Sequence, residues 1–194
     1  MERFHEEERK LRRLERVGRD IYEKHPVPSS SAWFMQPSIR KQMLSTDFFK
    51  GLPKDSEYRK TLVDNLKIFG KVRQFIHKEV LRSIELSKNE RKLLKMIIQG
   101  NYVYQKPITA SPIDGTPSKL IRTAEQHGIG TKRLEEILAQ AKREIGTWTD
   151  LARESEKPKM DHVMRRPLEY YGSLAAIALQ EAKAHNERQT RKRR

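Results

Sequence analysis

The longest hydrophobic pattern in the chain lies between Asp55 and about Leu86. Eight apolar residues recur there every three or four positions: Tyr58, Leu62, Leu66, Phe69, Val72, Ile76, Val80 and Ile84. This spacing predicts one amphipathic α-helix. At ~1.5 Å per residue the helix would be ~45 Å long. Its one glycine, Gly70, indicates a bend or a close helix crossing.

Two helices are predicted before this pattern. A narrow apolar stripe in an otherwise charged segment predicts a helix over residues 1–24, and Pro26 and Pro28 end it. Eight Lys or Arg alternate there with seven Asp or Glu, which is typical of a helix lying across a surface. A short helix is predicted from about Ser38 to Phe49, and the sequence Gly51-Leu52-Pro53 closes it.

Local end signals predict three helices after the long one. Ser87 and Glu90 have the spacing of a capping box, and the helix that they start ends before Gly100. Thr116 precedes Pro117 as a cap before a proline at the first helical position. The helix that follows runs to about Gln126. After a break at Gly128-Ile129-Gly130, another helix covers residues 132–145, so the pair predicts an αα-hairpin.

The remaining segments show weaker patterns. Residues 101–110 have some strand character, although Pro107 restricts them to an edge or an extended arm. Residues 146–167 lack a regular pattern and are expected to be irregular, and Pro167 is expected to open the last helix, which frays into a basic tail.

The predicted fold class is all-α: a small irregular helical bundle with one long central helix, an αα-hairpin, and extended N- and C-terminal arms. Three consecutive segments are expected. Residues 1–37 form a charged helix and an anchoring loop, residues 38–145 the helical core, and residues 146–194 a linker, the C-terminal helix and the basic tail.

Composition indicates the class of partner. The 194 residues include 41 Lys or Arg and 26 Asp or Glu, a net charge of +15. The excess is spread along the chain and is largest over residues 87–110, at +4. A dispersed basic excess favours a polyanionic partner, and RNA slightly over DNA, because folded RNA presents phosphate on many sides. No apolar stretch approaches the ~20 residues of a membrane span.

No signature of catalysis rises above background. Without cysteine, the chain has no disulfide, thiolate metal site or cysteine nucleophile. Its six histidines are scattered and lack the spacing of a zinc site. A phosphate-binding loop of the Walker A type needs Lys before Ser or Thr, whereas here Thr131 precedes Lys132. We therefore expect no enzyme activity, no cofactor, no metal and no small-molecule substrate.

The Gly128-Ile129-Gly130 turn is similar to the hairpin of helix-hairpin-helix modules, whose backbone amides bind a phosphate. The residues before it, Thr123, Gln126 and His127, depart from the apolar pattern usual in those modules. Two interpretations stay open: a phosphate site, and a plain helix end followed by a new helix start.

Basic clusters supply the candidate RNA-binding residues, since Lys and Arg neutralise phosphate and release counterions. They are Lys88, Arg91, Lys92, Lys95, Lys132, Arg133, Arg165, Arg166, Arg188, Arg191, Lys192, Arg193 and Arg194. Three aromatic residues, Trp33, Phe34 and Trp148, are the candidate anchors to neighbouring proteins.

These features predict a non-catalytic structural subunit of a large ribonucleoprotein, most plausibly a mitochondrial or other organellar ribosomal protein that contacts rRNA and neighbouring proteins. Two alternatives stay open: a helical accessory or scaffold subunit of a protein-only complex, and a DNA-binding architectural protein. The acidic residues near the N-terminus do not fit a transit peptide. A mitochondrial matrix or another ribosome-containing compartment is favoured, with no visible targeting peptide.

Overall fold

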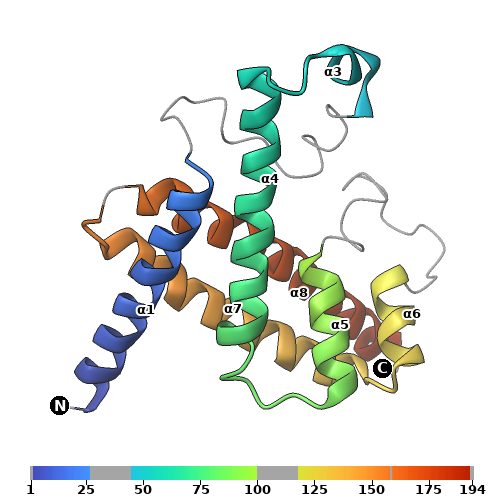
Figure 1. Cartoon of the computed structure of the whole chain (residues 1–194). Coiled ribbons are helices and arrows are strands. Elements are labelled where there is room, and N and C mark those ends of the chain that lie inside the picture. The colour runs from blue at the N-terminus through green and yellow to red at the C-terminus, as the bar shows by residue number, and fades with distance from the viewer. Residues whose placement is uncertain (1, 27–44, 100–117, 158, 193–194) are drawn as a thin grey trace. The chain divides into compact units, whose positions relative to one another are not determined.

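The structure, a computed structural model, describes residues 2–26, 45–99, 118–157 and 159–192 (Figure 1). Every regular element in these ranges is helical, which confirms the predicted all-α class. The elements, where η marks a π-helical turn, are α1 (Glu2–Lys24), α3 (Asp47–Gly51), α4 (Glu57–Phe75), η2 (Ile76–Val80), α5 (Lys88–Ile98), α6 (Lys119–Gln126), α7 (Thr131–Glu154), η3 (Asp161–Arg165) and α8 (Arg166–Lys192).

The chain divides into two compact units. Unit 1 comprises residues 1–75 and 148–170, and unit 2 comprises residues 76–147 and 171–194. The boundaries fall between α4 and η2, within α7 and within α8. Each unit therefore combines segments that are distant in the sequence, a division that differs from the three consecutive segments expected above.

Unit 1 is built on the mutual contacts of α1, α4 and η3. Leu14 and Ile21 of α1 are buried, as the narrow apolar stripe predicts. Phe75 meets Trp148 edge to face, with ring centroids 5.0 Å apart. At Gly18, α1 approaches η3 so closely that an added Cβ would lie 2.5 Å from the Sδ of Met160. A larger residue at this position would require the Met160 side chain to move.

In unit 2, α6 ends in a Schellman motif. Gly128 has the positive φ, 70°, that such an end requires. The Gly128 amide donates to the Glu125 carbonyl at 2.9 Å, and the Ile129 amide donates to the Ala124 carbonyl at 2.9 Å. The Ile129 side chain is buried. Both amides are thus used within the protein, which supports the plain helix-end interpretation over a phosphate site at these two positions.

The long helix is shorter than predicted. Instead of continuing to Leu86, α4 passes into the π turn η2, and the helix ends by Val80. The Leu81 amide donates to the Ile76 carbonyl at 2.9 Å, five residues back. The hydroxyl of Ser83 then donates to the Val80 carbonyl at 2.7 Å. Gly70 lies within continuous helix, and an added Cβ there would meet nothing within 4 Å, so this glycine is not the site of a close helix crossing.

The region predicted as irregular, 146–167, is largely helical. Helix α7 continues past Ile145 to Glu154 because Trp148, Leu151 and Ala152 are buried at helical spacing. Their burial outweighs the cost of about 1 kcal/mol that Gly146 imposes on a helix. Pro167 does not open the last helix either: η3 precedes it, and α8 begins at Arg166.

The start of α6 also differs from the prediction. Its first helical residue is Lys119, two positions after Pro117. Ser118 is the N-cap, and its hydroxyl accepts from the Ile121 amide at 3.3 Å.

The short helix predicted from about Ser38 to Phe49 falls partly in the described residues, where α3 covers Asp47–Gly51. The predicted capping box at Ser87 is confirmed. Predictions for residues 27–44 and 100–117 lie outside the described residues.

We expect Phe75→Ala to lower the free energy of unfolding by about 3–5 kcal/mol, because it empties a buried site and removes the edge-to-face contact with Trp148. Tyr58→Ala is the control: Tyr58 is 45% exposed, and its removal should cost about 1 kcal/mol. Urea unfolding of both variants measures the difference. Equal losses would contradict the assignment of Phe75 to the core of unit 1.

Candidate nucleic-acid interface

Positive charge is in greater excess on unit 2 than on unit 1. The described residues of unit 2 include sixteen Lys or Arg against nine Asp or Glu, whereas those of unit 1 include twenty against sixteen. A phosphate-binding surface needs cations that are exposed and not already paired with carboxylates. The partners of each candidate cation therefore decide whether it is available to a phosphate.

Three lysines of α5 meet both conditions. Lys88, Lys92 and Lys95 are exposed, and none has an ion pair with any residue in the described ranges. Their spacing of four and three residues puts them on one face of the helix, over about 10 Å along its axis. The opposite face buries Leu93, Leu94 and Ile97 in unit 2. We call these three residues the lysine stripe.

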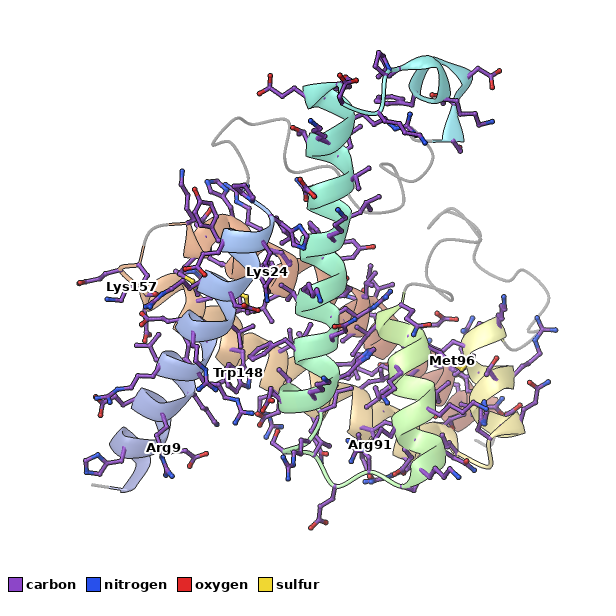
Figure 2. The ribbon with its side chains drawn as sticks, viewed as in Figure 1. Arg9, Lys24, Arg91, Met96, Trp148 and Lys157 are labelled. Atoms are coloured by element: carbon purple, nitrogen blue, oxygen red, sulfur yellow. The ribbon has the colours of Figure 1, made fainter. Side chains whose placement is uncertain are left out.

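Arg91, the fourth member of this sequence cluster, has a structural role. Its guanidinium Nη1 donates to the Leu81 carbonyl at 3.0 Å, in the turn that follows η2. Arg91 is labelled on α5 in Figure 2. The side chain is half-buried. Arg91 therefore satisfies a backbone carbonyl left without a helical partner, rather than joining the stripe.

Glu90 holds the start of α5 against the start of α7. Its Oε2 accepts from the Ser87 amide at 2.7 Å, and the Ser87 hydroxyl accepts from the Glu90 amide at 3.2 Å, which completes the capping box. Its Oε1 accepts from Nε of Arg133 at 2.7 Å. The hydrogen bond from Arg133 keeps the pKa of the Glu90 carboxyl below its usual value, against the opposing effect of desolvation.

Arg133 is therefore engaged within the protein. Besides Glu90, it donates to Oε2 of Glu136 at 3.2 Å and to the Glu85 carbonyl at 3.2 Å. A further link joins the same two regions, since the Asn89 amide group donates to the His127 carbonyl at 3.1 Å. Lys132, next to Arg133, is exposed and has no ion pair within the described ranges. Of these two candidates, only Lys132 is available to a phosphate.

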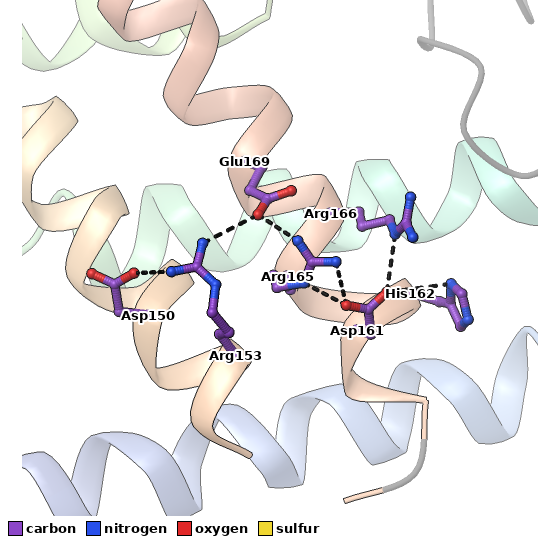
Figure 3. A network of polar contacts seen from close by, with 7 residues as sticks. All are labelled: Asp150, Arg153, Asp161, His162, Arg165, Arg166 and Glu169. Atoms are coloured by element: carbon purple, nitrogen blue, oxygen red, sulfur yellow. Dashed lines mark hydrogen bonds and ion pairs between the residues drawn. The ribbon is translucent and has the colours of Figure 1, made fainter. Parts of the chain in front are cut away.

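Arg165 and Arg166 belong to a polar network in unit 1 (Figure 3). Both donate to Asp161, Arg166 at 3.0 Å, and Arg165 also donates to Glu169 at 2.5 Å. Arg153 extends the network from Glu169, at 3.5 Å, to Asp150, at 2.9 Å. Three arginines thus face three carboxylates. The local charge balances, and the network links α7, η3 and α8 within unit 1.

The same network affects two pKa values. Burial raises the pKa of Asp161, but the hydrogen bonds from Arg166 and Arg165 outweigh that effect and hold it below its usual value. The pKa of His162 is lowered, chiefly by desolvation, with Asp161 opposing. The side chain of His162 is therefore biased toward its neutral form, and the carboxylate of Asp161 toward its charged form.

The end of α8 carries the described part of the basic tail. Arg188 and Arg191 are exposed, and Nε of Arg188 donates to the Ala184 carbonyl at 3.1 Å. An open cavity of about 480 Å³ lies here, lined by Glu135, Lys183, Asn186, Glu187, Thr190 and Arg191. Its two cations and two carboxylates balance, so the cavity does not select an anion. The Lys192 side chain, Arg193 and Arg194 lie outside what the structure describes.

Of the three candidate aromatic anchors, only Trp148 belongs to the described residues. Trp148 is 4% exposed and packs against Phe75, so it anchors α7 within unit 1 instead of offering a surface to a neighbour. Trp33 and Phe34 lie outside the described residues.

Within the described ranges, no group of three His, Asp or Glu side chains is placed to hold a metal ion. None of the helices in these ranges has the length and apolar character of a membrane span.

Sequence reasoning missed the residues that organise this interface. Glu90 was predicted as a cap, but not as the partner of Arg133, which is 43 positions away. Asn89 was not predicted to contact the α6–α7 turn, 38 positions away. No local pattern reports such contacts, since they depend on the packing of α5 beside the turn.

We expect Glu90→Gln to lower the free energy of unfolding at pH 7 by about 1–2 kcal/mol, because an amide replaces a charged acceptor whose side chain is only 11% exposed. The lowered pKa means that the charged carboxylate stabilises the fold above its ordinary pKa of 4.5, and that this contribution is lost as the pH falls through the lower, folded value. The difference between the two proteins should therefore shrink in acid.

Glu136→Gln provides the matched control. Its carboxylate also pairs with Arg133 but is 61% exposed, so the change should cost less than about 0.5 kcal/mol. Denaturant unfolding of the three proteins at a series of pH values makes the comparison. A pH-independent gap between wild type and Glu90→Gln would contradict the charge-based role.

Searches with this sequence and structure found no matching family model, no matching curated protein and no matching solved structure. The function is therefore inferred from the charge distribution and the geometry of the chain itself.

Proposed function

We propose that this chain is a non-catalytic structural subunit of a ribonucleoprotein and that it binds RNA phosphates through the lysine stripe of α5. The observation that carries the proposal is that Lys88, Lys92 and Lys95 stay exposed and unpaired within the described ranges, while Arg133, Arg165 and Arg166 pair with carboxylates.

The spacing of the stripe suits a nucleic-acid strand. Each strand of double-stranded DNA carries one phosphate per about 3.4 Å of helix axis, so the ~10 Å of the stripe, laid along such an axis, corresponds to an axial rise of about three phosphates. Lysine ammonium groups neutralise phosphates without needing a fixed geometry. Such contacts fix position without reading sequence, as a structural subunit requires.

Contacts between α5 and the rest of unit 2 hold the lysine stripe in place. Glu90 and Asn89 fasten the start of α5 to the α6–α7 region, at 2.7 Å and 3.1 Å, and the buried face of α5 adds apolar contact. Lys132 extends the positive surface at the start of α7. A fixed row of cations loses less conformational freedom on binding than a flexible tail does.

An organellar ribosome is the particle that we propose. The support for it is α1, a mixed-charge helix whose ion pairs run along its own surface: Lys10 to Glu6 at 3.3 Å, Arg12 to Glu8 at 2.5 Å, and Lys24 to Asp20 at 2.7 Å. Alternating charge of this kind is typical of a helix that lies across a surface, and α1 buries only a narrow stripe in unit 1.

We expect the triple variant Lys88→Gln, Lys92→Gln and Lys95→Gln to bind RNA more weakly and with less salt dependence. Removal of three phosphate contacts should reduce the slope of log K against log salt by about 2 to 3 units. Fluorescence anisotropy with a structured RNA, titrated at several salt concentrations, gives the slope. Glutamine keeps the helix propensity, so the fold should be unaffected.

The matched control removes the same charge elsewhere: Lys54→Gln, Lys60→Gln and Lys71→Gln, all exposed and in unit 1. This control should shift the slope by less than about 1 unit. Equal slopes for the two triple variants would show that only net charge matters and would contradict a defined interface on α5.

We also expect the tagged protein, purified natively from its own cells, to sediment in a sucrose gradient with a large particle. Ribonuclease should break that particle, because its integrity depends on RNA. Sequencing of the co-migrating RNA would identify the particle. Sedimentation in a small assembly that ribonuclease leaves intact would refute the proposal and favour a protein-only complex, and comparable affinity for duplex DNA would favour an architectural DNA-binding protein.

A further inference from the structure

Unit 1 holds a cavity of about 370 Å³ that the proposed RNA-binding function does not use. It lies between α1 and the segment that leads into η3. The residues that line it are Glu15, Gly18, Arg19, Tyr22, Lys157, Lys159, Met160 and Val163. Figure 2 shows Lys157 beside α1, in agreement with this lining.

The floor of the cavity is apolar. Met160 and Val163 are buried, and Tyr22 lines the cavity from α1. Gly18 contributes only backbone, since a Cβ there would meet Met160. Ligand pockets in proteins commonly combine such a floor with a few polar groups, and their volumes begin near 300 Å³.

The rim of the cavity is cationic. Arg19, Lys157 and Lys159 line it, and none of the three has an ion pair within the described ranges. The one carboxylate, Glu15, already accepts a hydrogen bond from the Ser155 hydroxyl at 2.7 Å. The cavity thus has three cations against one carboxylate, in contrast to the balanced cavity of unit 2.

Lys159 has an unusual backbone conformation. Its φ is 69°, in the left-handed region that a residue with a Cβ rarely adopts. Glycine is the usual residue in this conformation, whereas here a lysine adopts it and lines the cavity. Strained residues of this kind cluster at ligand-binding sites.

We propose that this cavity binds a small organic carboxylate with a short apolar chain. The carboxylate would face the Arg19 guanidinium, which matches its planar shape, and the two lysines, while the chain would occupy the floor. At about 30 Å³ for each non-hydrogen atom, the cavity holds roughly twelve such atoms. Octanoate, with ten, is therefore a suitable probe.

The experiment titrates the full-length protein with octanoate, octanol and acetate. Isothermal calorimetry measures affinity, and NMR of the methionine methyl groups reports location. We expect saturable octanoate binding that shifts the Met160 methyl and leaves Met96, in unit 2, unchanged. Octanol, which lacks the charge, and acetate, which lacks the chain, should each bind at least tenfold more weakly. Equal binding of either one, or an unshifted Met160, would overturn the proposal.

Two variants test the cations. Lys159→Gly removes the ammonium and retains a residue that tolerates positive φ, and Arg19→Gln removes the guanidinium. The double variant should bind octanoate at least tenfold more weakly. Arg16→Gln is the control, because Arg16 is exposed on α1 and does not line the cavity. If the double variant kept its octanoate affinity while its circular dichroism matched wild type, the carboxylate role of the rim would be refuted.

Discussion

The carboxylate of Glu90 fixes the start of α5, the helix that bears the lysine stripe, against the start of α7 in unit 2. One oxygen accepts from the Ser87 amide, and so starts α5 at a defined residue. The other accepts from Arg133 at the start of α7. Because α5 cannot rotate about its axis without breaking these bonds, the three lysines are held on the outer face. Buried charge is costly unless it is paired and hydrogen-bonded, and here both conditions are met.

The cations of this protein are divided between two tasks by their chemistry. Arg91, Arg133 and Arg165 use planar guanidinium groups to join carboxylates and carbonyls from different segments, which a forked donor does well. The lysines of α5 form no such link and keep their hydrated charge at the surface. A strongly basic sequence therefore contains fewer available cations than its number of Lys and Arg residues suggests. Which cations are available depends on which of them pair with carboxylates or carbonyls in the fold.

Features that depend on neighbouring residues were predictable. The capping box at Ser87, the charged helix α1 and the helix end before Gly128 all follow from signals within a few positions. The length of α7 was not predictable from local signals. It depends on the burial of Trp148 against Phe75, which outweighs the helix-weakening effect of Gly146. Likewise, the sequence shows Arg165 and Arg166 as a basic cluster, whereas in the structure they pair with Glu169 and Asp161. The cavity of unit 1 joins residues about 140 positions apart, as the Ser155–Glu15 bond illustrates.

The π turn before Pro167 has a consequence for how this sequence can change over evolution. A π turn contains one residue more than an α-helical turn, and its wider backbone accommodates a ring that would otherwise clash with the carbonyl four residues earlier. Loss of one residue within 161–165 would restore a regular helix and preserve the faces of α8, whereas loss of one residue later would rotate everything after it by about 100°. Homologues should therefore place single-residue gaps in η3, and those with the gap should lack the proline.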